Sequence, residues 1–146
     1  MTSHSNEVFE TMFSMKLAAL PEGVPNGDTE RVTGSVGFAG ETINGAVYLH
    51  LPARFASLLA ACLLGTSAEG LNPAEVNDAV GEITNMLTGG LKSWLCDLGA
   101  ACAMSTPGII RGNAYAIEAP PEVSRLCLGF SSGADRFCVE VHIEQQ

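Results

Sequence analysis

A carboxylate and a carboxamide stand three residues apart at Glu82 and Asn85, in the run Glu82-Ile-Thr-Asn85-Met-Leu-Thr-Gly89. On a helix, side chains three residues apart are neighbours on one face. A carboxamide donates and accepts hydrogen bonds at the same time, and it stays neutral beside an anion, which a carboxylate does not. The pair therefore places a negatively charged hydrogen-bond acceptor beside a neutral group that both donates and accepts hydrogen bonds.

The segment around this pair predicts one long helix over 73–97. Asn72-Pro73-Ala74-Glu75 supplies a cap, a first-turn proline and an acid at the third helical position. At about 100° per residue, one sector of this helix is apolar and is the expected core face. That sector holds Val76, Val80, Ile83, Leu87, Gly90, Leu91 and Trp94. The opposite side is a narrow polar stripe of Asp78, Glu82, Asn85, Gly89 and Lys92.

The polar stripe has a simpler interpretation, because every amphipathic helix has a polar face and most such faces only meet water. The spacing Glu-x-x-Asn also occurs three times, at Glu41–Asn44, Glu69–Asn72 and Glu82–Asn85. Only the last lies in the middle of an expected helix. Asn and Gly are poor helix formers, and residues that give up helix propensity often have a functional reason. Gly89 also leaves the stripe open to close approach by a partner.

The elements around this helix predict an α+β fold. We expect a first helix over 5–20, a loop over 21–28, strands over 30–39 and 42–51, and a helix over 52–64 ending at Gly65. Three strands should follow the long helix, over 101–117 with a break near Pro107-Gly108, 123–131 and 135–144. An antiparallel sheet of about five to six strands, with helices packed on one face, accounts for this order. The whole chain, 1–146, is expected to form one domain.

Composition excludes several classes of function. The net charge is −9, and the seven basic residues are scattered, which argues against nucleic acid and anionic membrane surfaces as partners. No apolar run approaches the roughly 20 residues of a membrane span, and the first residues do not resemble a secretory signal. Five cysteines without a Cys-x-x-Cys pair are expected to be small buried thiols in a reducing compartment. We therefore expect a cytoplasmic protein.

No cofactor or metal site is expected from the sequence. No cluster of His, Asp and Glu has the spacing of metal ligands, and His4, His50 and His142 are expected to be core or surface histidines. Gly34, Gly37 and Gly40 match neither a dinucleotide fingerprint nor a phosphate loop, and are expected to be strand and turn glycines.

The run from Glu82 to Gly89 resembles the signature helix of the CheX/CheC-type chemotaxis phosphatases, E-[IL]-x-N-[MIL]-[IL]-x-G. The resemblance extends to Val8-Phe9-Glu-Thr-Met12-Phe13, to Gly45-Ala-Val-Tyr-Leu-His-Leu-Pro52 and to Thr106-Pro107-Gly108-Ile-Ile110, which match in kind and order. Members of the CheC type carry a second such motif on the first helix. Here that helix has Glu7 and Glu10 but no asparagine after them, so the chain resembles the single-site CheX type.

This resemblance implies a phosphatase that hydrolyses the aspartyl phosphate of a CheY-like response regulator. Asn85 would enter the regulator's site and orient the attacking water, and Glu82 would pair with the regulator's lysine. The Mg²⁺ would belong to the regulator, so the chain would need no cofactor of its own. The resemblance also implies a homodimer.

Asp78, Gly89 and Lys92 are candidate partner contacts, with solvated surface as the alternative for the two charged residues. Two other hypotheses remain for the whole chain. The first is a non-catalytic module that binds a receiver or a flagellar-switch component, and the second is a structural dimerisation domain whose polar stripe has no role.

Overall fold

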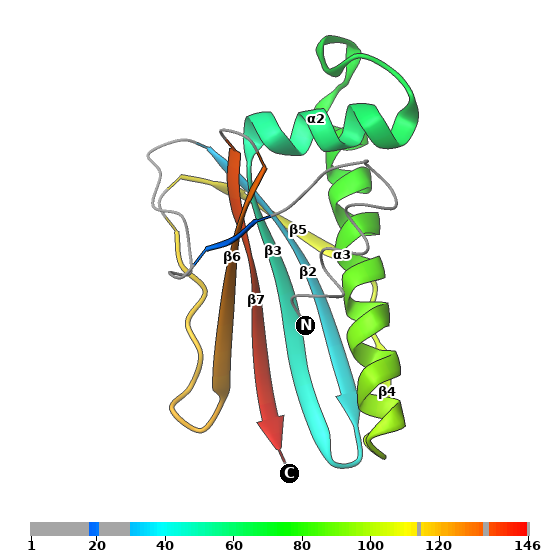
Figure 1. Ribbon diagram of the computed structural model, residues 1–146, viewed down its shortest axis with the longest axis vertical. Helices are drawn as coiled ribbons and strands as arrows, with labels where there is room; N and C mark the ends of the chain where they lie inside the picture. The colour runs from blue at the N-terminus through cyan, green and yellow to red at the C-terminus, as the bar shows by residue number, and fades with distance from the viewer. Residues whose placement is uncertain (1–17, 21–29, 114, 133–134, 146) are drawn as a thin grey trace.

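The fold is a single antiparallel sheet with helices against it (Figure 1). The structure, a computed structural model, describes residues 18–20, 30–113, 115–132 and 135–145. Its seven strands are β1 (Ala18–Leu20), β2 (Arg31–Gly40), β3 (Ile43–Pro52), β4 (Cys102–Met104), β5 (Gly108–Gly112), β6 (Ser124–Ser132) and β7 (Asp135–Gln145). They follow the order β1-β6-β7-β3-β2-β4, and β5 pairs with the same edge of β2 as β4. The predicted fold class is confirmed.

The start of the chain corrects one prediction. Most of the helix expected over 5–20, and the loop expected over 21–28, lie outside the described residues. Residues 18–20 are not helical but form β1, which pairs with β6 through Ala18 and Ser131. The run Ala18-Ala19-Leu20 is apolar without a clear period, so the open edge of β6 decides its conformation rather than local propensity.

The long strand expected over 101–117 is two shorter strands. β4 pairs with the end of β2 at Phe38–Gly40, and β5 pairs with its beginning at Arg31–Ser35. Ser105, Thr106 and Pro107 connect them, as the Pro107-Gly108 break predicts. The described residues from 113 to 117 are not strand, which corrects the expected end, because the chain leaves β2 after Gly112 and Tyr115 packs its ring under the Arg31 guanidinium.

Among the described residues, two helices cover one face of the sheet. They are α2 (Ala53–Leu64) and α3 (Pro73–Asp97), joined through the short helix η1 (Ala68–Gly70). α2 ends at Gly65 with φ +67°, the left-handed conformation that glycine adopts without strain. Figure 1 shows α3 running along the strands and α2 crossing near their ends. None of the described helices combines the length and apolar character that a bilayer crossing requires.

The expected start of α3 is confirmed at the level of individual bonds. The Glu75 N–H donates to Asn72 Oδ1 over 2.9 Å, and the Asn72 N–H donates to Glu75 Oε1 over 3.2 Å. This reciprocal capping box satisfies two donors that a helix otherwise leaves without partners. Pro73 needs no such bond, since it has no N–H.

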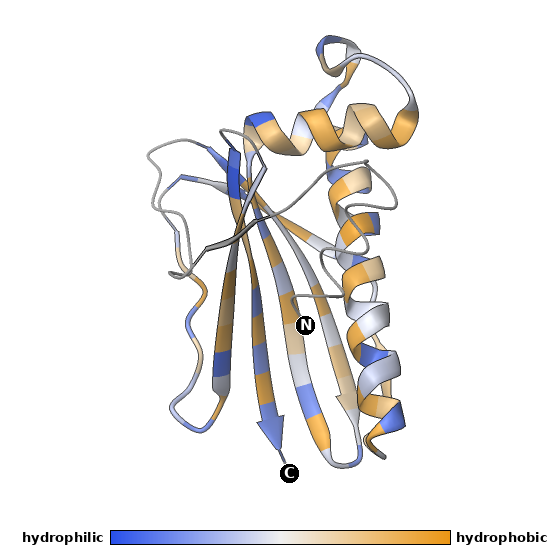
Figure 2. Cartoon of the chain, viewed as in Figure 1, coloured by the Kyte–Doolittle hydropathy of each residue, from blue (hydrophilic) through white to orange (hydrophobic). Residues whose placement is uncertain are grey.

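Alternation along the strands sorts apolar and polar side chains onto two faces. Leu49 and Val139 lie side by side on the face that meets α2 and α3, and so do Val32 and Leu51. Thr33, His50 and Cys138 lie side by side on the opposite face, and all three are buried as well. Both faces of the central strands are therefore covered. Figure 2 shows the hydrophobic and hydrophilic residues alternating along the strands.

The core between sheet and helices contains the large aromatic side chains. The ring of Phe137 stacks on that of Phe55 from α2 at 5.3 Å and on that of Phe130 from β6 at 5.5 Å. Most of the predicted core face of α3 is buried, namely Val76, Val80, Ile83, Leu87 and Leu91. Two residues of that face are not buried: Gly90 is half-buried, and 58% of the surface of Trp94 is exposed. In the last turns of α3 the buried side chains are Thr88, Leu91 and Leu95, so the buried face rotates away from Trp94.

Candidate functional site

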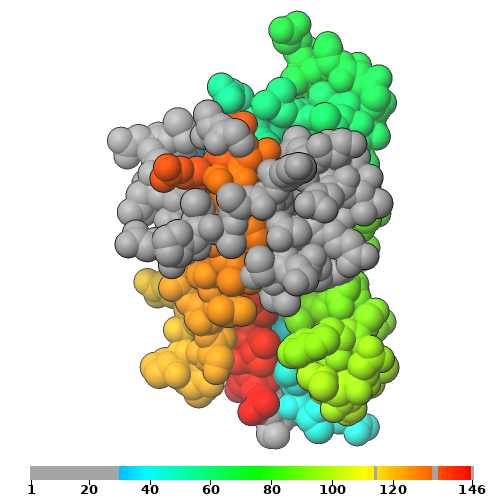
Figure 3. Space-filling view, viewed as in Figure 1, coloured from blue at the N-terminus to red at the C-terminus, as the bar shows by residue number. Residues whose placement is uncertain are grey.

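The polar stripe lies along the side of α3 that faces away from the sheet. Asp78, Glu82 and Lys92 are exposed, while Asn85 and Gly89 are half-buried. Within the described parts of the chain, Glu82 and Asn85 form no hydrogen bond or ion pair, so both side chains are available to another molecule. Figure 3 shows the C-terminal half of α3, in light green, at the molecular surface. α3 brings all five candidate residues together on one surface.

Gly89 leaves one position of the polar stripe without a side chain. A Cβ built on it would meet no atom within 4 Å. Glycine in the interior of a helix costs about 1 kcal/mol relative to alanine. The packing of the described residues therefore does not require glycine at this position.

The opposite side of α3 is fixed closely to the sheet. A Cβ on Gly34 of β2 would collide with the hydroxyl of Thr84, so only glycine allows this approach of helix and strand. The Thr84 hydroxyl donates to the Val80 carbonyl over 2.7 Å, and the Thr88 hydroxyl donates to the Thr84 carbonyl over 2.8 Å. These buried hydroxyls thus find partners inside their own helix, and the depth of α3 is set by backbone contact rather than by flexible side chains.

A second support comes from β5 and the residues before it. The ideal Cβ position of Gly81 lies 3.2 Å from Pro107 Cβ, so the proline ring packs directly on the helix backbone. The Arg111 Nε donates to Asn77 Oδ1 over 2.7 Å. Gly81 precedes Glu82 and lies one turn from Asn85, so these contacts hold the part of α3 that carries the candidate pair.

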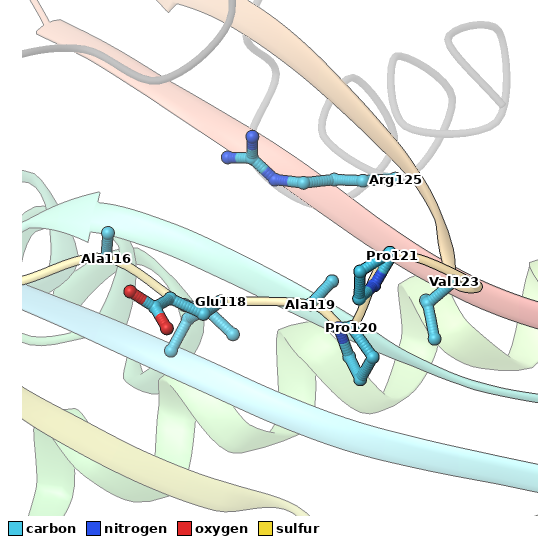
Figure 4. A pocket seen from close by; sticks show the side chains of 8 residues that line it. Ala116, Glu118, Ala119, Pro120, Pro121, Val123 and Arg125 are labelled. Atoms are coloured by element: carbon cyan, nitrogen blue, oxygen red, sulfur yellow. The ribbon is translucent and has the colours of Figure 1, made fainter.

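The polar stripe does not line the hollow found among the described residues. A hollow of about 500 Å³ lies elsewhere, lined by Ala116, Ile117, Glu118, Ala119, Pro120, Pro121, Val123 and Arg125. Figure 4 shows the Arg125 side chain across from the 116–123 segment. No residue of the polar stripe lines this hollow. An exposed stripe that carries two free polar side chains suits a macromolecular partner better than a small ligand that must be enclosed.

A buried polar network on the far face of the sheet was not expected from the sequence. The carboxylate of Glu140 accepts hydrogen bonds from His50 Nε2 at 2.9 Å, from His142 Nε2 at 2.6 Å and from Arg125 Nε at 2.7 Å. Thr33 Oγ1 lies 2.8 Å from His50 Nδ1, within hydrogen-bonding distance, and extends the network to β2. The prediction that His50 and His142 are core or surface histidines is borne out, since both are buried.

The network fixes the charge of Glu140. Burial would raise the pKa of this carboxyl, but the hydrogen bonds from His50, Arg125 and His142 outweigh burial and lower the pKa to about 2. The same carboxylate raises the pKa of Arg125. The side chain of Glu140 is only 1% exposed, so it reaches no substrate from solution. The network therefore stabilises the sheet and is separate from the polar stripe.

Metal ligands are not gathered in the part of the chain that the structure describes. There, no group of three or more His, Cys, Asp or Glu side chains is arranged to hold a metal ion. The expectation of five buried thiols is wrong for Cys62 and Cys96, which are exposed, whereas Cys138 is buried. Cys127 and Cys138 are neighbours, with 3.8 Å between their sulfurs, and burial raises the pKa of the Cys138 thiol.

Comparison with known proteins identifies the family of this chain. The family model described as "Chemotaxis phosphatase CheX" matches residues 32–131, which span the described sheet from β2 to β6 and the whole of α3. The chain belongs to the CheX family. This membership makes it a chemotaxis phosphatase, and the enzyme hypothesis is confirmed at the level of the family. Among curated proteins, none matches the chain.

Solved structures agree with the CheX assignment. The chemotaxis protein CheX from Vibrio vulnificus is 32% identical, with a TM-score of 0.83 over 98% of this chain and 93% of that one. A CheC-like superfamily protein from Shewanella sp. PV-4 is 27% identical, with a TM-score of 0.82 over 98% and 94% of the two chains. A CheX from Borrelia burgdorferi, solved in complex with CheY, BeF3 and Mg²⁺, shares the fold at 18% identity, with a TM-score of 0.78 over 98% and 94%.

Proposed function

We propose that this CheX-family phosphatase hydrolyses the aspartyl phosphate of a CheY-like receiver domain, and that Asn85 orients the attacking water. The observation that carries the proposal is the neighbouring pair of Glu82, which is exposed, and Asn85, which is half-buried. Their helix is held by Gly34 of β2 and by Pro107 packed on Gly81. The CheX of Borrelia burgdorferi was solved bound to CheY, which supports a receiver as the partner.

The reaction needs little covalent help from the protein. An aspartyl phosphate is a mixed anhydride. Water attacks its phosphorus, the bond from phosphorus to the carboxylate oxygen breaks, and the products are free aspartate and inorganic phosphate. Phosphoryl transfer is accelerated mainly by positioning and by charge. The Asn85 carboxamide accepts a hydrogen bond from the water and stays neutral beside the phosphoryl oxygens.

Glu82 has the complementary task in this proposal. Its carboxylate is exposed about one turn before Asn85, where it would pair with the lysine of the receiver's active site. The pair would fix the register in which the two proteins dock. The Mg²⁺ that neutralises the phosphoryl charge is held by the receiver, so this chain contributes no ligand to it.

Three further properties belong to the proposal. The chain acts as one domain over 1–146, pairs as a homodimer, as the single-motif members of the family are expected to do, and works in the cytoplasm, where receivers are found. Sedimentation of the purified protein tests the dimer, and fractionation of cells tests the compartment.

The deciding experiment follows the decay of a phosphorylated receiver from the same organism, with and without this protein. Asn85→Ala should lower the acceleration by about 100-fold or more, because the water loses its hydrogen-bonding partner. Asn44→Ala is the matched control, because Glu41 and Asn44 have the same spacing in the β2–β3 hairpin. Equal activity of wild type and Asn85→Ala would refute the mechanism. Binding of the activated receiver without faster decay would favour the non-catalytic binding module.

A further inference from the structure

The connection between β4 and β5 forms a raised edge beside the polar stripe. Its residues Ser105, Thr106, Pro107 and Gly108 are all exposed. The Pro107 ring sits on Gly81, with 3.2 Å between Pro107 Cβ and the position of a Cβ on the glycine. Residues four apart on a helix are neighbours, so this ring lies one turn from Asn85 and next to Glu82.

Hydrogen bonds to β2 hold this connection in place. The Ser105 N–H donates to the Gly37 carbonyl over 2.9 Å, and the Gly37 N–H donates to Ser105 Oγ over 2.8 Å. At the other end, Gly108 pairs with Ser35 in the sheet. The segment 105–108 is therefore fastened to β2 at both ends and to α3 in the middle, so its outer surface has a fixed position relative to Asn85.

We propose that the 105–108 segment, which we name the β4–β5 edge, is a second contact for the receiver and helps to select which receiver is accepted. The inference rests on the proposed function. A receiver that brings its phosphoryl group to Asn85 must lie over α3 at Glu82, and the β4–β5 edge borders that part of the helix. Rigid, exposed and mostly uncharged residues suit such a contact, since little conformational entropy is lost on binding.

The occupant is identified by continuity with the polar stripe. Gly108 and Gly89 have no atom within 4 Å of an added Cβ, so the surface is without side chains at one place on the edge and one on the helix. Asp78 and Glu82 make the helical part acidic, whereas the edge carries no charge of its own. The charges of Asp78 and Glu82 would orient the receiver, and the uncharged β4–β5 edge would favour receivers whose surface is complementary to it in shape.

Thr106→Trp tests the proposal with a bulky group that points into solvent and leaves the fold intact. Thr66→Trp, in the exposed turn after α2, is the matched control. We expect Thr106→Trp to raise KM for the phosphorylated receiver by about tenfold, with kcat little changed, because docking is hindered but the Glu82–Asn85 pair is not. Thr66→Trp should behave as wild type.

Binding is measured in parallel, using a receiver activated with beryllofluoride and Mg²⁺, which cannot be hydrolysed. Weaker binding by Thr106→Trp supports the proposal even if wild type does not accelerate phosphate loss, in which case only the proposed function fails. Equal binding by Thr106→Trp, Thr66→Trp and wild type overturns it. A fall in kcat with unchanged KM also overturns it, because the edge would then act through the site rather than through docking. Absence of any receiver binding by wild type overturns both proposals.

Discussion

Gly34 and Thr84 pack so closely that a methyl group on the glycine would overlap the threonine hydroxyl. This contact sets how deeply α3 lies against β2, and α3 carries the residues of the proposed chemistry. The position of the site therefore depends on a glycine in a strand on the other side of the helix.

Gly34→Ala should destabilise the fold by about 1–3 kcal/mol, the usual cost of adding atoms to a packed core. Thr84 is buried and bonded to the Val80 carbonyl, so it cannot simply turn away. Denaturant unfolding measures the loss. In a Thr84→Ala background the cost should be smaller, because the colliding hydroxyl is gone, although Val80 still limits the space. Strict additivity of the two substitutions would contradict the contact.

Gly89→Ala should separate stability from activity. The substitution should stabilise the protein by about 1 kcal/mol, because alanine is the better helix former and no atom obstructs its Cβ. Receiver dephosphorylation should nevertheless fall, since the added methyl stands where the partner approaches. Thermal unfolding and decay assays measure the two effects. Cys62→Ala, at an exposed helical position of α2, should leave activity unchanged. Full activity of Gly89→Arg would show that no partner approaches there.

Glu82→Gln should raise KM for the receiver and flatten its dependence on salt concentration, because one charge of the docking pair is removed. The fold should be unaffected, as Glu82 is exposed. Glu69→Gln, in the copy of the same spacing that begins in η1, provides the comparison and should keep the wild-type salt dependence. If Glu82→Gln had the same KM as wild type, the result would contradict the proposed ion pair between Glu82 and the receiver.

Acid should weaken the fold through Glu140. Its pKa is lowered from 4.5 to about 2, so the network stabilises the fold fully above pH 4.5 and loses this contribution as the pH falls from 4.5 toward 2. The loss is about 3 kcal/mol for a shift of this size. Glu140→Gln should lack this component and be less stable than wild type at pH 7. Unfolding curves of both proteins across this range measure the difference, and parallel pH profiles would contradict it.

Local signals in the sequence were sufficient for α3. Asn72, Pro73 and Glu75 predict its start, and the structure has the corresponding bonds and the same bounds as the expected 73–97. The placement of Glu82, Asn85 and Gly89 on one accessible side also follows from helical periodicity. Their roles stay predictions, since periodicity gives the position of a side chain but not its chemistry.

Tertiary contacts account for what the sequence did not predict. Trp94 falls in the apolar sector of an idealised straight helix, but the buried face rotates toward Thr88 and Leu95, because β2 and β4 cover that side. β1 forms because β6 offers an open edge, which is invisible in residues 18–20 themselves. The Glu140 network includes His50, which lies 90 positions away in the chain, so no short-range sequence pattern could predict this contact.

The accessible side of α3 has a chemical consequence for the proposed reaction. Under that proposal, Glu82 and Asn85 supply only part of the reacting site, while the receiver brings the aspartyl phosphate, its lysine and the Mg²⁺. Neither protein alone would then hold the complete set of reacting groups. Dephosphorylation would therefore be confined to the time during which the two proteins are joined, and its rate would depend on how long each complex lasts.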